Sequence, residues 1–188
     1  MPANTPRGYT YPLLSDTQNF PAQIQDLAQD IDLDVESLDN AIQAAYNRDS
    51  VRVTGPIGGT QAIASGAGGA SITYSTEVYD NNGMANLGVL NDRITFQTQG
   101  IYLITAHVRW DVGPNATWGA VVALTSTGST VAQPALMSRQ GHNTRQTDMT
   151  ITAPHFASVG NTMRVVAAQV SGVAVNVINA SLTVTLLS

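Results

Sequence analysis

RITFQTQGIYLITAHVRW, residues 93–110, is the stretch that decides the fold. In its second half one set of residues, Tyr102, Ile104, Ala106, Val108 and Trp110, alternates with another, Leu103, Thr105, His107 and Arg109. A period of two in a run rich in aromatic and β-branched side chains is typical of a strand with one buried face. We therefore expect two strands joined by a tight turn at Gln99-Gly100, with the first set of residues facing the core.

Short strand-like runs lie on both sides of this stretch, from Ser71 to the end of the chain, and Gly, Asn and Pro separate them. They are SITYSTEVYD, WGAVVALTS, VAQPALMS, DMTITAPHFAS, TMRVVAAQVSG and ASLTVTLL. Roughly eight to ten short strands with this punctuation predict an antiparallel sandwich or jelly roll. The Gly-rich segment 50–72 is placed inside the same domain, as its first strand and a loose connection. The chain is thus predicted to be mainly β, with a head domain at 50–188.

Residues 21–48 have the periodicity of an α-helix, and we assign 21–49 to a helical stalk. The apolar positions are Ile24, Leu27, Ile31, Val35, Leu38 and Ile42. Their spacing is heptad-like with one extra four-residue step, a stutter that locally unwinds a coiled coil. The stripe fits a short trimeric coiled coil, and it also fits an ordinary amphipathic helix packed on its own domain.

The polar side of this helix is acidic. It carries Asp26, Asp30, Asp32, Asp34, Glu36 and Asp39, and no Lys or Arg occurs from residue 21 up to Arg48. Such helices side by side repel one another, because opposite charges at flanking positions are missing. A bundle of them needs help from the head, from the N-terminal arm or from a basic partner. Asp49 belongs to the same acidic part of the sequence.

Charged residues make up only 11% of the chain, against about 25% in ordinary soluble domains. So few charges suggest that part of the surface is hidden in an oligomer. The absence of a basic patch argues against nucleic-acid binding, and no apolar run has the length of a membrane span. The chain has no Cys, which excludes disulfides and thiolate metal sites. The N-terminus lacks the layout of a signal peptide.

Residues 1–20 are predicted to form an extended docking arm. Prolines at positions 2, 6 and 12 forbid a long helix. Large apolar side chains suit a segment that lies on another protein, and these are Tyr9, Tyr11, Leu13, Leu14 and Phe20. The alternative is a disordered tail, as termini often are.

No pattern of catalytic or metal-binding residues stands out. His107, His142 and His155 lack partners at metal-ligand spacing, and Asp111 and Asp148 read as lone carboxylates. The serines lack a nucleophile-elbow context and no phosphate-binding loop is present. We therefore expect no enzymatic activity, no catalytic residues, no cofactor and no metal.

A polar loop at residues 139–147 is the candidate for recognition. It carries Arg139, His142, Asn143 and Arg145 without an apolar residue, and such loops on a rigid sandwich can form hydrogen bonds without altering the core. Trp118 is the candidate for an exposed aromatic contact. The alternatives are a merely solvated loop and a core position for Trp118.

Three pieces of the sequence resemble the tumour-necrosis-factor-like jelly roll, and above all the globular heads of the complement q subcomponent with their bacterial and viral relatives. They are EVYDNNGM (77–84), residues 93–110 and ASLTVTLL (180–187). Tyr79-Asp80 with Gly83, then Gly100-Ile101-Tyr102, then the closing apolar strand match in order and approximate spacing. The resemblance covers roughly residues 50–188 and implies a jelly-roll head that is typically trimeric.

The N-terminal piece TPRGYTYPLLSDTQNFPAQIQDLAQDID resembles the start of small virion proteins of tailed phages that infect actinobacteria, known as minor tail or head-fibre proteins. This resemblance implies a location on the virion, which is assembled in the host cytoplasm. It also implies that the arm binds other virion proteins of the tail or capsid.

Together these features predict a non-enzymatic virion protein that forms a homotrimer. Its arm anchors it to the particle, and its head projects outward as a minor tail or fibre protein for host adhesion, with a host cell-surface glycan as a candidate partner. One alternative is a capsid decoration or head-fibre protein on the phage head. Another is a free lectin-like binding module.

Overall fold

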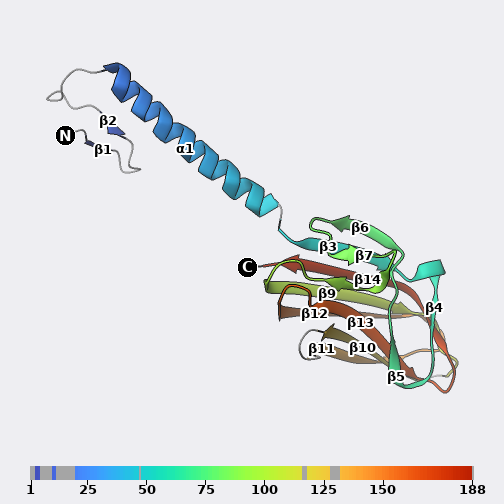
Figure 1. Cartoon of the computed structure of the whole chain (residues 1–188). Coiled ribbons are helices and arrows are strands. Elements are labelled where there is room, and N and C mark those ends of the chain that lie inside the picture. Colours follow the sequence, from blue (N-terminus) through green and yellow to red (C-terminus); the bar gives the residue numbers. More distant parts are fainter. Residues whose placement is uncertain are drawn as a thin grey trace. The chain divides into compact units, whose positions relative to one another are not determined.

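The computed structural model describes residues 3–4, 10–11, 20–46, 48–115, 118–127 and 132–187. The chain divides into two compact units, Met1–Asn47 and Arg48–Ser188, which we describe one by one. In the first unit, β1 (Ala3–Asn4) pairs antiparallel with β2 (Thr10–Tyr11), and a single long helix α1 spans Phe20–Tyr46 (Figure 1).

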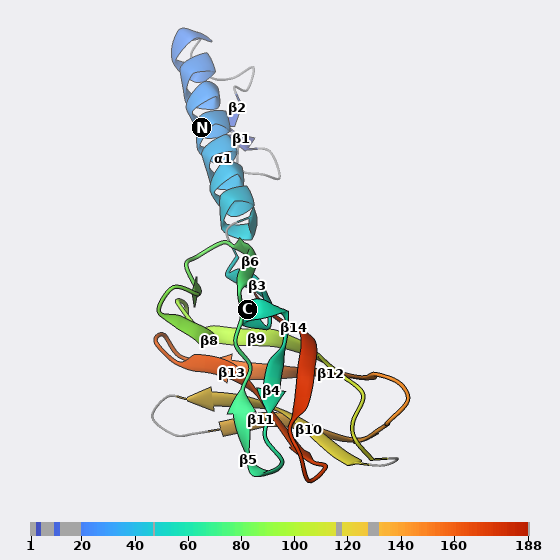
Figure 2. The same ribbon diagram turned by 90° about the vertical axis from the view of Figure 1, so that its right-hand side faces the viewer.

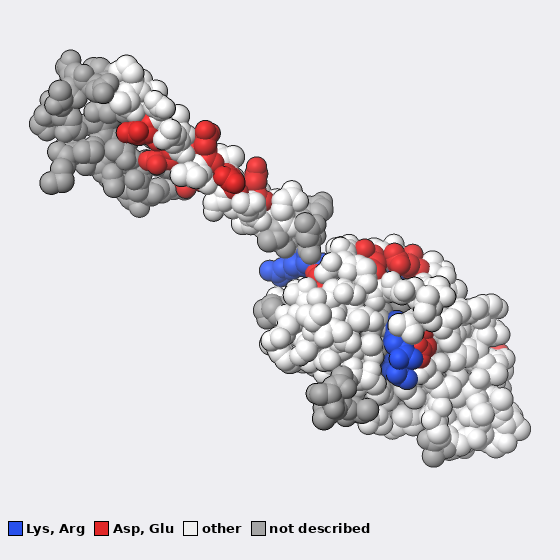
Figure 3. Space-filling view, in the orientation of Figure 1, with Lys and Arg blue, Asp and Glu red and all other residues white. Residues whose placement is uncertain are grey.

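The predicted helix is confirmed by α1. Pro21 lies in its first turn, where a missing N–H has no helical partner to lose. Its six stripe residues, Ile24 to Ile42, are between 37% and 66% exposed within the single chain. The red side chains along the helix in Figure 3 are its Asp and Glu residues, and no Lys or Arg occurs within Phe20–Tyr46. The coiled coil itself stays a prediction.

The described part of the head forms two antiparallel sheets. The first has six strands, in the order β12 (Thr147–Ala157), β9 (Gly100–Trp110), β14 (Val175–Leu186), β3 (Ser50–Gly55) and β6 (Thr76–Asp80), with β4 (Gln61–Ile63) paired to β14. The first and last strands of the head, β3 and β14, are direct neighbours. Leu182 of β14 lies opposite Val53 of β3 in this pair.

The second sheet has five strands. Their order is β11 (Ala132–Gly141), β10 (Trp118–Thr127), β13 (Thr162–Val170), β8 (Leu90–Thr95) and β7 (Ala85–Asn86). β5 (Gly66–Ser71) lies against β13, and the short turn Ile57–Gly59 precedes β4. Gly69 in β5 has φ +58°, and a Cβ there would lie 2.8 Å from a methyl group of Val166. Only glycine allows this close approach in the left-handed conformation.

The core lies between the two sheets, which stack as two layers (Figure 2). Tyr102, Ile104, Ala106, Val108 and Trp110 of β9 are all fully buried, so the predicted inward face of this strand is confirmed. The opposite sheet contributes inward side chains of β10 and β13, among them Val122, Leu124 and Val165. The result is a mainly β, jelly-roll-like sandwich.

One expectation about residues 93–110 is wrong. β8 and β9 are not two strands of one hairpin sheet. β8 pairs with β13 and β7, whereas β9 pairs with β12 and β14 in the other layer. The connection at Gln99-Gly100 therefore crosses between the layers. Alternation within a strand reports which side is buried, and it contains no information about which strand lies next to it.

Candidate functional site

The candidate site is the side of the six-stranded sheet that points away from the core. Successive side chains of a strand point to opposite faces, so the residues between the buried positions of β9 lie on this side. They are Ile101, Leu103, Thr105, His107 and Arg109, and none of them is buried. We call this surface the outer sheet face. Its chemistry changes along β9 from apolar to hydroxylated to charged.

One end of the outer sheet face is apolar. Ile101 lies opposite Phe156 of β12, and the Leu187 amide donates to the Ile101 carbonyl over 2.7 Å. With Leu103, these side chains are 39% to 57% exposed. Exposed apolar residues scattered singly are ordinary, whereas neighbouring ones form a patch that marks an interaction surface.

The middle of the outer sheet face is lined by threonine. Thr105 of β9 lies between Thr152 of β12 and Thr183 of β14, and the Thr105 and Thr152 hydroxyls are 3.1 Å apart. Threonine suits a strand because its side chain is β-branched. Arg52 of β3 follows Thr183 in the same row and is exposed.

The other end carries a charged cluster. Arg109 Nε donates to Asp148 Oδ1 over 2.8 Å, and His107 Nε2 lies 2.9 Å from the same oxygen. Arg109, and next His107, lower the pKa of the Asp148 carboxyl below its ordinary value. Asp148 is therefore not the lone carboxylate that the sequence suggested. The register places it directly opposite Arg109, and this pairing is a long-range property that no local motif contains.

A second carboxylate, Asp49, lies buried where the head begins. It accepts a hydrogen bond from the Tyr102 hydroxyl at 2.9 Å and one from Asn82 Nδ2 at 2.7 Å, and its own carbonyl accepts the Leu186 amide. Burial first, and then the hydrogen bond to Asp49, raise the pKa of the Tyr102 hydroxyl, which stays protonated and able to donate. Asp49 thus belongs to the head's buried polar contacts and not to the acidic helix surface.

We expect Asp49→Ala to lower the free energy of unfolding by about 2 kcal/mol, because a buried hydrogen-bonded side chain is lost. Asn82 Nδ2 then loses its Asp49 acceptor, and the Tyr102 hydroxyl keeps only the Thr98 carbonyl, which lies 2.7 Å away. Chemical denaturation of the full chain at one fixed concentration measures this loss. Glu77→Ala, which removes an exposed carboxylate on the edge strand β6, is the matched control. Equal losses in the two variants would contradict a structural role for Asp49.

His155, on β12 opposite Tyr102, lies beside Phe96 with their ring centroids 6.3 Å apart. Burial lowers its pKa below the ordinary 6.5. As the pH falls, His155 of the unfolded chain takes up a proton at a higher pH than His155 of the folded head. Protonation therefore favours the unfolded chain, and the head should lose stability as the pH falls below about 6.5. Unfolding measured between pH 7.5 and 5 should show a smaller decline in His155→Gln than in the unaltered protein. Identical declines would contradict this assignment.

The recognition loop predicted at 139–147 is shorter in the structure, because 139–141 belong to β11 and Thr147 to β12, which leaves 142–146 as the connection. Arg139 belongs to β11 and donates through Nη1 to the Asp148 carbonyl at 2.7 Å, so it ties the loop to the charged end of the outer sheet face. His142 Nδ1 lies 3.0 Å from the Thr144 hydroxyl. Asn143 and Arg145 are exposed. A recognition role for this loop stays a prediction.

Trp118 lies in the core, the alternative that we left open for it. It is 3% exposed, and its ring stacks edge-on against Trp110 with centroids 5.6 Å apart. Gly113 and Gly141 lie against the indole, and a Cβ at either glycine would come within 2.1 Å of it. Trp118 is therefore mainly a core residue that packs beneath the recognition loop, and its indole Nε1 donates to the His142 carbonyl at 3.4 Å.

An open groove of about 820 Å³ lies on the five-stranded sheet. Small and apolar residues of β10 and β13 line it, among them Gly119, Val121, Ala168 and Val170, and it is also lined by the polar or charged side chains Ser138, Arg139, Gln140 and Gln169. Sequence reasoning missed this groove, since its floor comes from alternate positions of two strands that become neighbours only in the fold. It is a secondary candidate for a ligand site.

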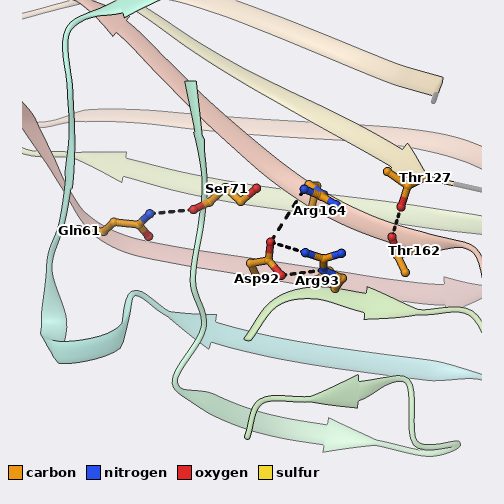
Figure 4. A network of polar contacts seen from close by, with 7 residues as sticks. All are labelled: Gln61, Ser71, Asp92, Arg93, Thr127, Thr162 and Arg164. Atoms are coloured by element: carbon orange, nitrogen blue, oxygen red, sulfur yellow. Dashed lines mark hydrogen bonds and ion pairs between the residues drawn. The ribbon is translucent and has the colours of Figure 1, made fainter. Parts of the chain in front are cut away.

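A polar network lies at the start of β8 (Figure 4). Arg93 contacts Asp92 with Nε at 2.7 Å from Oδ1 and Nη2 at 3.0 Å from Oδ2, and Arg164 Nη1 lies 4.0 Å from Asp92 Oδ2. The hydrogen bond from Arg93 lowers the pKa of the Asp92 carboxyl. Nearby, the hydroxyls of Thr127 and Thr162 join β10 to β13. The Arg93–Asp92 contacts lie within β8, whereas the Arg164 and threonine contacts link neighbouring strands, and we interpret the network as structural.

The anchoring residues predicted in the arm fall largely outside the described part. Tyr9, Leu13 and Leu14 lie outside the described residues, and for Tyr11 and Phe20 the structure describes the backbone alone. Their role stays a prediction. The stalk residues Ile24, Leu27, Ile31, Val35, Leu38 and Ile42 all belong to α1.

No group of three His, Asp or Glu residues capable of holding a metal occurs among the residues that the structure describes. A search of the same residues finds no helix long and apolar enough to span a membrane.

Solved structures of other proteins share the fold of the head, while no protein-family model and no curated protein matches the chain. The globular domain of zebrafish complement 1qA superposes with a TM-score of 0.55 and 11% identity over 75% of this chain and 98% of that one. Eiger TNF from S. frugiperda superposes with a TM-score of 0.57 and 10% identity, over 75% of this chain and 93% of that one. Murine APRIL superposes with a TM-score of 0.58 and 12% identity, over 74% of this chain and 99% of that one.

The head is a jelly roll of the TNF and complement-q type. This bears out the fold that the sequence resemblance implied for residues 50–188. Identities of 10% to 12% establish the fold alone. The chemistry of the outer sheet face therefore has to carry any argument about what the head does.

Proposed function

We propose that this chain is a non-enzymatic structural protein of a tailed-phage particle, that it forms a homotrimer through its jelly-roll head, and that its N-terminal arm anchors it while the head projects outward. Within this class we favour a minor tail or fibre protein that touches the host surface. The observation that carries the proposal is the outer sheet face, whose apolar end is built by neighbouring strands and stays exposed in a single chain.

The outer sheet face suits association with further copies of the head. Its apolar end gains free energy on burial, at about 25 cal/mol for each Å² removed from water. Its threonine rows can form hydrogen bonds across a subunit contact. At its charged end Asp148 is already paired with Arg109, so association need not bury this carboxylate without a partner. The low charge content of the chain agrees with a hidden surface.

Two further arguments support self-association. The head shares its fold with the TNF and complement-q domains, a fold that is typically trimeric. The helix that directly precedes the head carries a second exposed apolar surface, the α1 stripe. Two exposed apolar surfaces on consecutive segments are most simply explained if copies of the same chain cover both.

The virion location is supported by the N-terminal sequence resemblance and by the order of arm, helix and head, which provides an anchor, a spacer and an exposed domain. The same resemblance covers head-fibre proteins. A capsid decoration or head-fibre role on the phage head is therefore the second candidate. In both cases the partners are other virion proteins, and host adhesion would add a surface glycan.

Light scattering of the purified full chain tests the trimer. The expected mass is three times 19.8 kDa at micromolar concentration, and one chain mass would overturn the proposal. Immunogold electron microscopy with an antibody to residues 50–188 tests the location. Gold at the tail tip supports the adhesion role, and gold over the capsid supports the decoration role. Particles without gold would overturn the virion assignment and favour a free lectin-like module, which a glycan array then tests.

A further inference from the structure

The apolar stripe of α1 repeats itself after eleven residues. Ile24, Leu27 and Ile31 recur as Val35, Leu38 and Ile42, with the same spacing and the same order of branched, Leu and Ile side chains. What resembles a stutter in a seven-residue pattern is thus one period of an eleven-residue pattern. Such a repeat corresponds to about 3.67 residues per turn, slightly more than the 3.6 of a straight α-helix.

This period decides the path of the stripe along the helix. A stripe with 3.67 residues per turn runs almost parallel to the helix axis and drifts slowly in the right-handed sense. It therefore extends over both repeats of a helix roughly 40 Å long. Only a partner that is itself elongated and lies lengthwise on α1 can cover all six positions.

Within the described residues β2 lies near α1, and the stripe nevertheless keeps a large accessible surface for such a partner. Its six side chains remain at least 37% exposed, and Leu33, on the opposite side of the helix, is 65% exposed. The two sides differ in pattern, since the stripe is continuous whereas Leu33 is flanked by Asp32 and Asp34. The repeated side supplies a long continuous surface, and the opposite side does not.

The connection to the head determines which partner is at hand. α1 ends at Tyr46, and Asp49 is already buried in the head, so the three residue-to-residue steps from Tyr46 to Asp49 span at most about 10 Å. When heads associate, each helix end is held within this short reach of its own head. Short tethers produce effective concentrations in the millimolar range. This offsets the mutual repulsion of helices that carry acidic residues and no basic ones.

We propose that the α1 stripe binds the same stripe of two further copies of this chain, in parallel and in register, as a three-helix bundle with a slight right-handed twist. The proposal rests on the trimer proposed above and adds the register, direction and twist of its stalk. Parallel alignment places Ile24 beside Ile24 and Val35 beside Val35. Each layer of the bundle then contains three identical apolar side chains.

The chain has no Cys, so single cysteine substitutions in the full chain report these contacts directly. The axes of packed helices lie about 8–10 Å apart, and the Cα atoms of each helix lie about 2.3 Å from its axis. Cα atoms that face the bundle core are therefore close enough to those of the neighbouring helix for a disulfide, whereas outward-facing Cα atoms are too far apart. On mild oxidation, I24C and V35C should form covalent dimers efficiently. L33C, the matched variant on the opposite side, should remain monomeric on a denaturing gel.

D34C separates the two possible periods. A seven-residue pattern continued from Ile31 places residue 34 in the core, whereas the eleven-residue pattern places Val35 there. We expect V35C to cross-link faster than D34C, and the reverse order would overturn the eleven-residue bundle. Efficient cross-linking only in a mixture of I24C and I42C, and not in I24C alone, would show antiparallel helices and would equally overturn it.

Light scattering of the same variants under reducing conditions separates this inference from the proposed function. A trimeric mass without cross-linking at Ile24 or Val35 would overturn the bundle and leave the trimeric head standing. A monomeric mass would overturn both. A trimeric mass with the expected cross-links supports both.

Discussion

We expect Phe156→Asp to reduce the full chain from a trimer to a monomer at micromolar concentration. Phe156 is 57% exposed at the apolar end of the outer sheet face, opposite Ile101, so a carboxylate there folds without harm in the single chain. In a trimer it would be buried without a partner, at a cost of about 3 kcal/mol or more per copy. Three copies amount to about 9 kcal/mol, roughly six powers of ten in the association constant.

Val89→Asp is the matched control for this experiment. Val89 is 77% exposed in the turn between β7 and β8, away from the outer sheet face, so the same charge there should leave the mass unchanged. Light scattering gives the mass, and circular dichroism verifies that both variants are folded. If Phe156→Asp stays trimeric, the heads associate through another surface, and the interface assigned to the outer sheet face is wrong.

The second large effect is expected at Gly141, in the core of the head. A Cβ at this position would lie 2.1 Å from Cε2 of Trp118, which is closer than any real contact. The indole has little room to move aside, because the Trp110 ring packs edge-on with it at 5.6 Å and Gly113 also lies against it. Gly141→Ala should therefore force β10 and β11 apart and lower the free energy of unfolding by about 3 kcal/mol.

Thermal unfolding at one fixed subunit concentration measures this loss, and the expected fall in melting temperature is about 10 °C. Gly68→Ala is the matched control, because a Cβ there has nothing within 4 Å. By restricting the unfolded chain it should be neutral or stabilise by about 0.5 kcal/mol. A destabilisation of similar size in both variants would show that Trp118 has room to move.

The alternation in residues 93–110 was enough to predict β9 and to separate its inward residues from its outward ones. Tyr102 and Trp110 are buried while Leu103 and Arg109 are not, because a period of two is a local property of the strand. The same residues could not reveal that β8 and β9 lie in different layers. Strand partners are set by contacts far apart in sequence, and no local pattern encodes them.

The candidate site shows the same limit. Asp148 and Arg109 are 39 residues apart, and only the register of β12 on β9 turns two isolated charges into one cluster. Asp49 sits next to an acidic helix in the sequence, and its burial depends on Tyr102, which lies 53 residues away. The α1 stripe, by contrast, was readable from sequence, because helical spacing is local.

The neighbouring position of β3 and β14 has a consequence for biosynthesis. β14 lies between β9 and β3, so the six-stranded sheet has no centre until the last strand of the head has left the ribosome. Until then β9 and β3 present unpaired backbone edges, which are prone to aggregation in a nascent chain. α1, in contrast, is synthesised before any strand of the head. On polysomes that translate one message, the helices of neighbouring nascent chains are exposed to one another before the heads can close.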